Sequence, residues 1–233
     1  MLSVDRLCTF YGSSQALFDM ALEVHRGEVV TLIGRNGMGK TTTIHSIMGL
    51  VKPGTGSVRY NDVELTTLPS FKIARLGLGL VPEGRQIFPN LTVNENLIAT
   101  ASNTSRRAKP WDKNAVLSLF PPLAERLSSM GNLLSGGEQQ MLAIGRALMT
   151  NPDLLILDDA TEGLAPLVRK DIWASLQALK DSGLSILVVD KNLNDLLNLA
   201  DRHYVIEKGM VVWQGSSTAL ASDPSVKDRY LGV

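Results

Sequence analysis

The chain has 233 residues, enough for one sizeable domain or two small ones, and its 44% hydrophobic fraction is ordinary for a globular protein with a full core. Lysine plus arginine and aspartate plus glutamate number 23 each, so the formal net charge of zero offers no basic surplus for nucleic acid. A single cysteine, Cys8, excludes an internal disulfide. No apolar run approaches the ~18 residues that span a bilayer, so we expect any membrane role to be peripheral.

The first third of the chain reads as strands and turns around one glycine-rich loop. Residues 2–33 alternate as β structure does, and V-V-T-L-I at 29–33 is a short buried strand. The loop at 34–41 leads into a predicted helix that ends at Gly49. The remaining elements expected before residue 82 are a strand between turns at 53–62, a helix from Pro69 to about Leu76 and a buried strand at 78–81.

The middle third, about 88–140, interrupts this pattern with helices. Thr92 and Glu95 have capping-box spacing, which predicts a helix through about Ala101. The polar stretch 102–110 is the best linker candidate, and residues 111–127 read as helical with a break at Pro121-Pro122. We interpret this third as a helical subdomain inserted into the fold.

The last third alternates helices with strands. The expected elements are a helix at about 137–149, a strand at 154–158, a helix at 166–181, a strand at 184–189, a helix at 192–200 and a strand at 203–207. This order predicts an α/β fold with a mostly parallel sheet that is covered on both faces. His203 is expected at a surface or strand edge.

The segment G-R-N-G-M-G-K-T at 34–41 matches the phosphate-binding pattern G-x-x-x-x-G-K-[ST], and it stands between a buried strand and a helix. Its glycines let backbone N–H groups turn towards phosphate oxygens at a helix N-terminus. Lys40 is expected to reach the β- and γ-phosphates, and the Thr41 hydroxyl to meet Mg²⁺. A glycine-rich turn capped by threonine is the simpler alternative.

The apolar strand L-L-I-L at 154–157 ends in two aspartates. Asp158 is placed to hold Mg²⁺, as the aspartate after the second motif of P-loop NTPases does. Asp159 would then be the base that handles a water molecule. By itself an apolar run that ends in aspartate is often only a strand and a turn, so the assignment depends on residues 34–41.

The segment L-S-G-G-E-Q-Q at 134–140 resembles the signature motif of ATP-binding-cassette (ABC) ATPases, and the resemblance covers essentially the whole chain as one domain, 1–233. Within that family, residues 11–17, 34–43, 81–97 and 162–166 resemble the ATP-binding subunits of bacterial branched-chain amino acid importers; subunits of urea and short-amide importers are similar. The resemblance implies a P-loop NTPase core, an N-terminal antiparallel β subdomain and the inserted helical subdomain.

The resemblance also implies a site for ATP and Mg²⁺ at the interface of two such subunits, in a homodimer or a heterodimer. Tyr11 resembles the aromatic residue that stacks on adenine, although such a tyrosine is more often a plain strand-end residue. Ser135, which can also act simply as a helix N-cap, opens the group expected to meet the ATP of the opposite subunit. The implied nucleotide residues are Tyr11, Gly34, Arg35, Asn36, Gly37, Met38, Gly39, Lys40, Thr41, Thr42, Ser135, Gly136, Gly137 and Glu138, and the implied metal ligands are Thr41, Glu83 and Asp158.

Further partners follow from the same resemblance. Residues 81–90, with Arg85 and Phe88, would contact a membrane permease, unless they form an ordinary exposed loop. A periplasmic or extracellular solute-binding protein would act indirectly, and no nucleic acid is expected. The implied location is the cytoplasmic face of the bacterial inner membrane, as a peripheral subunit.

Two positions depart from the family pattern. Asp159 and Ala160 stand where the family usually has Glu and Pro. A side chain shorter by one methylene can misplace a water by roughly 1 Å, which can cost ~10²-fold in rate, unless an intervening water or a small backbone shift compensates. Asp190 and Lys191 stand where the branched-chain branch often has Glu and Gln. Lys191 either contacts the γ-phosphate as a catalytic cation, pairs with Asp159 and holds it away from water, or remains a solvated lysine.

Two functions from different classes follow. The first is an energy-coupling ATPase that drives uptake of branched-chain or other hydrophobic amino acids. The second is an ATP-dependent binding switch, in which Asp159 and Lys191 make hydrolysis negligible and a sister subunit hydrolyses ATP. A DNA-repair or ribosome-associated cassette is disfavoured, since the chain holds one cassette and no basic surplus.

Overall fold

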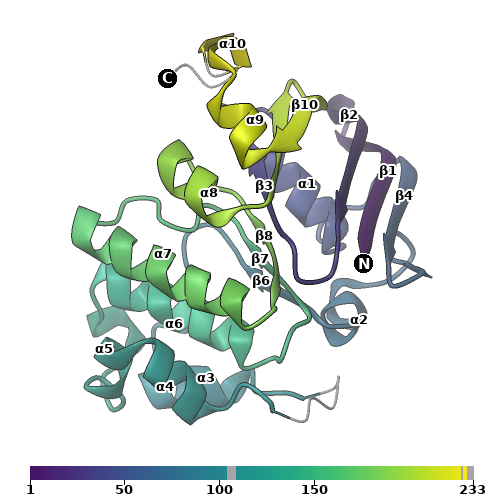
Figure 1. Ribbon diagram of the computed structural model, residues 1–233. Coiled ribbons are helices and arrows are strands. Elements are labelled where there is room, and N and C mark those ends of the chain that lie inside the picture. The colour runs from purple at the N-terminus through teal and green to yellow at the C-terminus, as the bar shows by residue number, and fades with distance from the viewer. Residues whose placement is uncertain (104–108, 227, 230–233) are drawn as a thin grey trace.

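The computed structural model describes residues 1–103, 109–226 and 228–229. These residues form two sheets and a set of helices (Figure 1). Among them, no helix is both long enough and apolar enough to cross a bilayer. The predicted linker at 102–110 lies mostly outside the described residues.

The larger sheet has six strands in the order β10-β9-β3-β8-β7-β6. Its strands are β3 (Val29–Ile33), β6 (Leu78–Val81), β7 (Leu154–Leu157), β8 (Ser185–Val188), β9 (Arg202–Glu207) and β10 (Met210–Ser216). Every pair is parallel except β9 with β10. Every residue of β3 and β7 is buried, as expected for central strands of a parallel sheet that is covered on both faces. The predicted parallel sheet is confirmed, and β10 is an addition that the sequence pattern did not indicate.

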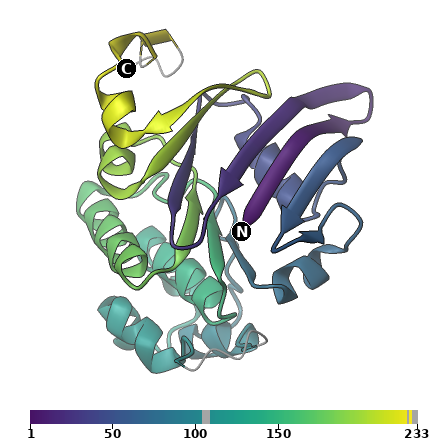
Figure 2. The same cartoon turned by 45° about the vertical axis from the view of Figure 1, so that its right-hand side comes forward.

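The smaller sheet is antiparallel, with the order β2-β1-β4-β5. Its strands are β1 (Leu2–Tyr11), β2 (Ser14–Val24), β4 (Thr55–Tyr60) and β5 (Val63–Glu64). Figure 2 shows its purple and blue strands on the side of the molecule away from the green helices. The predicted β structure of the N-terminal region is therefore confirmed.

Two apolar clusters lie on the two faces of the six-stranded sheet, as the alternation of side chains along a strand requires. Leu32, Ile156 and Leu187 face the antiparallel sheet and α1 (Lys40–Ile47). Leu155, Leu157 and Ile186 face the opposite side. That side is covered by α6 (Gly136–Leu148), α7 (Pro166–Asp181) and α8 (Leu193–Leu199).

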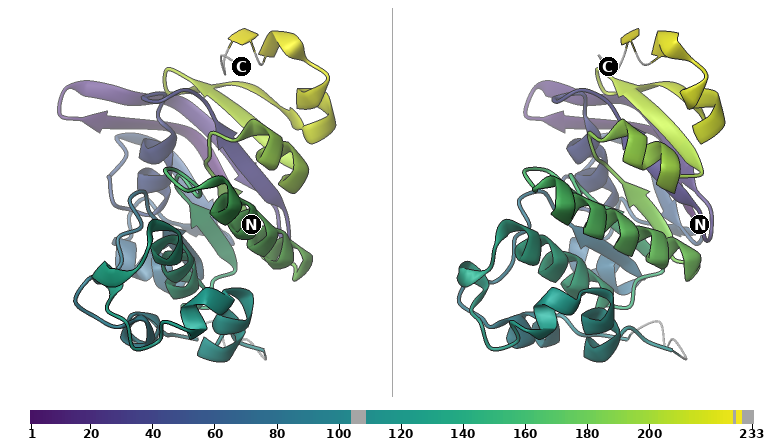
Figure 3. Two further views of the ribbon diagram at one scale, coloured as in Figure 1. Left: turned by 90° about the vertical axis from the view of Figure 1, so that its left-hand side faces the viewer. Right: turned by 60° about the vertical axis from the view of Figure 1, so that its left-hand side comes forward.

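The remaining helices are short. They are α2 (Ser70–Arg75), α3 (Val93–Ala99), α4 (Lys113–Leu119), α5 (Pro121–Ala124), α9 (Ser217–Ala221) and α10 (Pro224–Val226), with a 3-10 turn at Gly131–Leu133. The teal α3, α4 and α5 gather at the end of the molecule opposite the yellow α9 and α10 (Figures 1 and 3). The boundary of an inserted subdomain at about 88–140 stays a prediction.

Local signals placed several helix ends correctly. The capping box at Thr92 and Glu95 is present, with the Glu95 N–H donating to the Thr92 hydroxyl over 3.2 Å.

The expectation that His203 lies at a surface or strand edge was wrong, because the side chain is fully buried. Its Nδ1 lies 2.6 Å from the Thr31 hydroxyl and its Nε2 lies 2.8 Å from the Ser217 hydroxyl, so both ring nitrogens are partnered inside the sheet.

Candidate functional site

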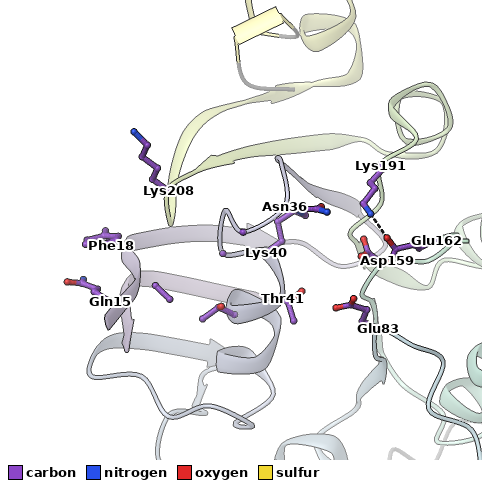
Figure 4. A pocket seen from close by; sticks show the side chains of 14 residues that line it. Gln15, Phe18, Asn36, Lys40, Thr41, Glu83, Asp159, Glu162, Lys191 and Lys208 are labelled. Atoms are coloured by element: carbon purple, nitrogen blue, oxygen red, sulfur yellow. Dashed lines mark hydrogen bonds and ion pairs between the residues drawn. The ribbon is translucent and has the colours of Figure 1, made fainter. Parts of the chain in front are cut away.

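Many of the residues that the sequence predicts to bind nucleotide or to act in catalysis line one cavity, of about 560 Å³, at the edge of the six-stranded sheet. The residues that line it are Gln15, Ala16, Phe18, Asn36, Gly37, Gly39, Lys40, Thr41, Thr42, Glu83, Asp159, Glu162, Lys191 and Lys208. Most of them follow the carboxyl ends of β3, β6, β7, β8 and β9, and loops at this edge are where open α/β sheets bind ligands. In Figure 4, Phe18 and Lys208 lie on the left and the carboxylates of Glu83, Asp159 and Glu162 lie on the right. The phosphate loop, with Asn36 and Lys40, lies between these two groups.

The phosphate loop is shaped by left-handed glycines. Gly37 has φ +79° and Gly39, the N-cap of α1, has φ +103°. A Cβ at Gly39 would lie 2.8 Å from Leu17 Cδ2, so this position needs glycine for space as well as for conformation. The Lys40 ammonium donates hydrogen bonds to the carbonyls of Gly34 and Arg35 over 2.8 and 3.0 Å, which closes the loop on itself. Burial lowers the pKa of Lys40.

Asp158 is the residue whose surroundings favour a metal ion most clearly. Its side chain is 1% exposed, and neither carboxylate oxygen accepts a well-formed hydrogen bond from a residue in the described ranges. Burial raises the pKa of Asp158, and the Thr41 hydroxyl opposes this rise in part. A buried carboxylate without partners is costly, and a cation removes that cost. The pair Thr41 and Asp158 therefore fits Mg²⁺, which prefers oxygen ligands.

Asp159 turns out of the strand in a left-handed conformation, with φ +53°. Aspartate adopts this conformation more readily than most residues. Its half-buried carboxylate lines the cavity beside those of Glu83 and Glu162, with one oxygen of each within 4.8 Å of the other two. Burial, followed by the negative charges of Glu162 and Asp158, raises the pKa of Asp159 to about 6.

Lys191 forms an ion pair with Glu162 rather than with Asp159, and the two side chains are about equally exposed, at 46% and 45%. The sequence-based alternative in which Lys191 pairs with Asp159 is therefore not what the structure contains. The dashed line in Figure 4 marks the pair at the rim of the cavity. Glu162 follows β7 and Lys191 follows the neighbouring β8, so strand pairing brings the two residues close together.

The signature segment 134–140 forms the N-terminus of α6, outside the cavity. Ser135 is its N-cap: the Ser135 N–H donates to the Glu138 carboxylate over 2.7 Å, and the Glu138 N–H donates to the Ser135 hydroxyl over 3.3 Å. A Cβ at Gly137 would lie 2.4 Å from Val168 Cγ1, so close packing of α6 on α7 requires glycine here. The structure confirms the N-cap and leaves the expected contact with a second subunit as a prediction.

Several sequence expectations differ from the observed lining. Tyr11 is 49% exposed at the end of β1 and does not line the cavity. Gly34, Arg35 and Met38 shape the loop from outside the lining, with the Lys208 N–H donating to Met38 Sδ. Residues that sequence reasoning missed are Gln15, Ala16, Phe18, Glu162 and Lys208. The alternation of β2, which puts Ala16 and Phe18 on one face, was a usable signal; Lys208 had none.

A second groove, of about 600 Å³, lies beside the 81–90 loop. Its lining includes Arg85, Phe88 and Arg146 and no aspartate or glutamate. The Arg146 guanidinium stacks 4.0 Å from the Phe88 ring centroid and donates to the Gln86 carbonyl over 2.8 Å. Arg85 and Gln86 both have positive φ, +65° and +42°, so the loop is held in a conformation that such residues rarely adopt.

Comparison with known proteins agrees with this geometry. The family model described as ABC transporter matches residues 17–162. The chain is 46% identical over 232 residues, covering 100% of both chains, to the high-affinity branched-chain amino acid transport ATP-binding protein BraG of Pseudomonas aeruginosa. It is 34% identical over 234 residues, covering 99% of this chain and 97% of the other, to the lipopolysaccharide export system ATP-binding protein LptB of Escherichia coli K12.

Solved structures show the same fold. A nucleotide-free ATP-binding cassette from an ABC transporter superposes with a TM-score of 0.84 at 27% identity, covering 97% of this chain and 96% of that chain. A dimeric ATP-binding cassette in a post-hydrolysis state with ADP and Pi superposes with a TM-score of 0.80 at 26% identity, covering 93% and 99%. The phosphate loop, the buried Asp158 and these full-length matches lead to one conclusion: the chain belongs to the ABC transporter family and is one of its ATP-hydrolysing, ATP-binding cassettes.

Proposed function

We propose that this chain is the ATP-binding subunit of an importer for branched-chain or other hydrophobic amino acids, and that it couples hydrolysis of MgATP to uptake through a membrane permease. The buried, unpartnered Asp158 beside Thr41 carries the MgATP part of the proposal. The full-length 46% identity to BraG supports the substrate class. The subunit would lie on the cytoplasmic face of the inner membrane, where ATP is available.

Each group of the cavity has a role in this function. The backbone N–H groups of the phosphate loop, the N-terminus of α1 and Lys40 bind the phosphates of ATP. Thr41, Asp158 and Glu83 would hold Mg²⁺, which neutralises phosphate charge when it is bound. Asp159, half-buried and aimed into the cavity, orients the attacking water. Lys191 supplies a cation at the γ-phosphate end.

Two subunits complete each site in this proposal. Ser135, Gly136, Gly137 and Glu138 lie outside the cavity at the capped N-terminus of α6, where the helix dipole favours an anion. A second cassette, identical or related, would present its ATP phosphates to this terminus. The dimeric cassette among the similar solved structures supports that arrangement.

The permease is proposed to contact the 81–90 loop and the groove beside it. Phe88 is 41% exposed there, and Arg85 and Arg146 supply positive charge. Glu83 lines the nucleotide cavity and Arg85 lines the groove, so the same short loop reaches both places. This continuity is a direct route by which nucleotide binding can alter the permease contact.

A second candidate is an ATP-binding switch with negligible hydrolysis of its own. It is favoured by the side chain of Asp159, which is one methylene shorter than the glutamate usual in the family. In that case a sister subunit hydrolyses ATP. A urea or amide importer would use the same machinery with a different solute.

The test is ATP turnover by the purified protein with Mg²⁺, beside the Asp159→Asn and Asp159→Glu variants. We expect wild type to turn over ATP and Asp159→Asn to lose about 10²-fold or more, because a positioned base contributes 10²–10⁴-fold. ATP affinity should persist in both variants. A silent wild type that binds ATP, together with restored turnover in Asp159→Glu, would establish the switch instead.

A further inference from the structure

Two loops at the edge of the cavity are bonded into one unit. The first, residues 159–162, follows β7, and the second, residues 189–192, follows the adjacent β8. The Ala160 N–H donates to the Val189 carbonyl over 3.2 Å. A proline at position 160 could not make this bond, because it has no N–H.

Side chains tighten the same unit. The N–H and the hydroxyl of Thr161 both donate to Asp190 Oδ2, over 2.8 and 2.7 Å. The Asn192 amide donates to Asp190 Oδ1 and to the Thr161 hydroxyl, over 2.8 and 2.9 Å. Asp190 and Thr161 are 4% and 2% exposed, so these bonds are shielded from water and hold the two loops in one relative position.

Two charged side chains project from this unit into the cavity. Glu162 follows Thr161, Lys191 follows Asp190, and the two form an ion pair at the rim. Each is nearly half exposed, and exposed ion pairs contribute little to stability. The buried network already fixes the loops, so the ion pair is not needed to hold them together.

The ion pair of Lys191 with Glu162 affects the neighbouring carboxylate of Asp159. Carboxylate oxygens of Asp159 and Glu162 lie within 4.8 Å of each other, so Lys191 has two acceptors close at hand and contacts Glu162. The ammonium of lysine is a compact charge with three donors. If Lys191 paired with Asp159, it would occupy the oxygens that a water molecule needs.

We propose that Glu162 is a positioning residue that holds Lys191 away from Asp159, so that the Asp159 carboxylate stays open to water. This inference rests on the proposed function, in which Asp159 orients the attacking water. It adds a residue that acts through its charge on a neighbouring side chain. Because the buried hydrogen bonds hold the two loops in place, Lys191 can change its partner between Asp159 and Glu162 by a movement of side chains alone.

The first measurement is steady-state ATP turnover by Glu162→Gln, with Glu125→Gln as the matched control. Glu125 is exposed at the end of α5, outside both the cavity and the groove. We expect Glu162→Gln to lower kcat about tenfold or more, since a positioned base is worth 10²–10⁴-fold, and to leave KM for ATP within about twofold. Glu125→Gln should match wild type. An unchanged kcat, or a raised KM with unchanged kcat, would overturn the proposal.

The second measurement does not depend on turnover. A water-soluble carbodiimide joins a lysine amine to a carboxylate that it touches, and mass spectrometry of fragment ions locates the link. Nucleotide-free wild type should give Lys191–Glu162, and Glu162→Gln should give Lys191–Asp159 instead, which the added Asp159→Asn change removes. If Glu162→Gln gives no link to Asp159, the inference is wrong even where the ATPase is active. If wild type is inactive but the link moves as expected, the pairing stands and the proposed hydrolysis fails.

Discussion

The phosphate loop and the carboxylate loops face each other across one cavity but are built differently. The phosphate loop, residues 34–41, is shaped by backbone: left-handed glycines, carbonyls that accept from Lys40, and the start of α1. The carboxylate loops, residues 158–162 and 189–192, are shaped by side chains from two strands that are about thirty residues apart in sequence. Backbone shape is encoded locally, whereas side-chain pairing depends on which strands become neighbours.

The largest expected effect tests the phosphate loop through the side chain of Lys40. Lys40→Met keeps the buried hydrocarbon stem and removes the ammonium, so the phosphates of ATP lose the positive charge that Lys40 would place beside them. We expect turnover to fall by about 10²–10³-fold, as when one preorganised donor is removed from an active site. ATP binding, measured by fluorescence of a labelled nucleotide, should weaken as well. Lys208→Met removes a second lysine from the cavity lining and serves as the control. It should lose far less, and equal losses would contradict a special role for Lys40.

A pair of glycine substitutions asks whether backbone shape governs this loop. Gly37→Ala adds a Cβ with nothing within 4 Å, so only the left-handed φ is strained. Gly39→Ala adds the same strain and a 2.8 Å approach to Leu17 Cδ2. We expect a destabilisation of about 1 kcal/mol for Gly37→Ala and about 2–3 kcal/mol for Gly39→Ala, since left-handed strain alone is worth ~1 kcal/mol or more. Denaturant unfolding measures both; identical values would mean that Leu17 yields without cost.

The smallest effect concerns stability on the carboxylate side. Asp158→Asn replaces a buried, unpartnered carboxylate by a neutral side chain of the same shape. We expect the nucleotide-free protein to gain about 1 kcal/mol in unfolding free energy, because burying a charged carboxylate costs more than burying a neutral amide at the same position. Thermal unfolding without nucleotide gives the readout, and a less stable variant would show that Asp158 has a structural partner.

Much of this protein was determined by its sequence alone, because the signals concerned are local. The glycine spacing at 34–41, the apolar strand before Asp158, the capping box at Thr92 and the N-cap at Ser135 each act within a few residues, and all lie where expected. The alternation of helices and strands was enough to predict a mostly parallel sheet.

Only the tertiary structure decided the arrangements that join distant segments. It placed β8 beside β7, which brought Lys191 close to the loop of Asp159 and Glu162, and Lys191 pairs with Glu162 there. It brought Phe18 and Lys208 into the cavity and left Tyr11 outside its lining. It also buried His203 between Thr31 and Ser217. In each case the contact depends on the order of the strands and on which side chains are close in space. Neither can be read from the spacing of residues along the chain.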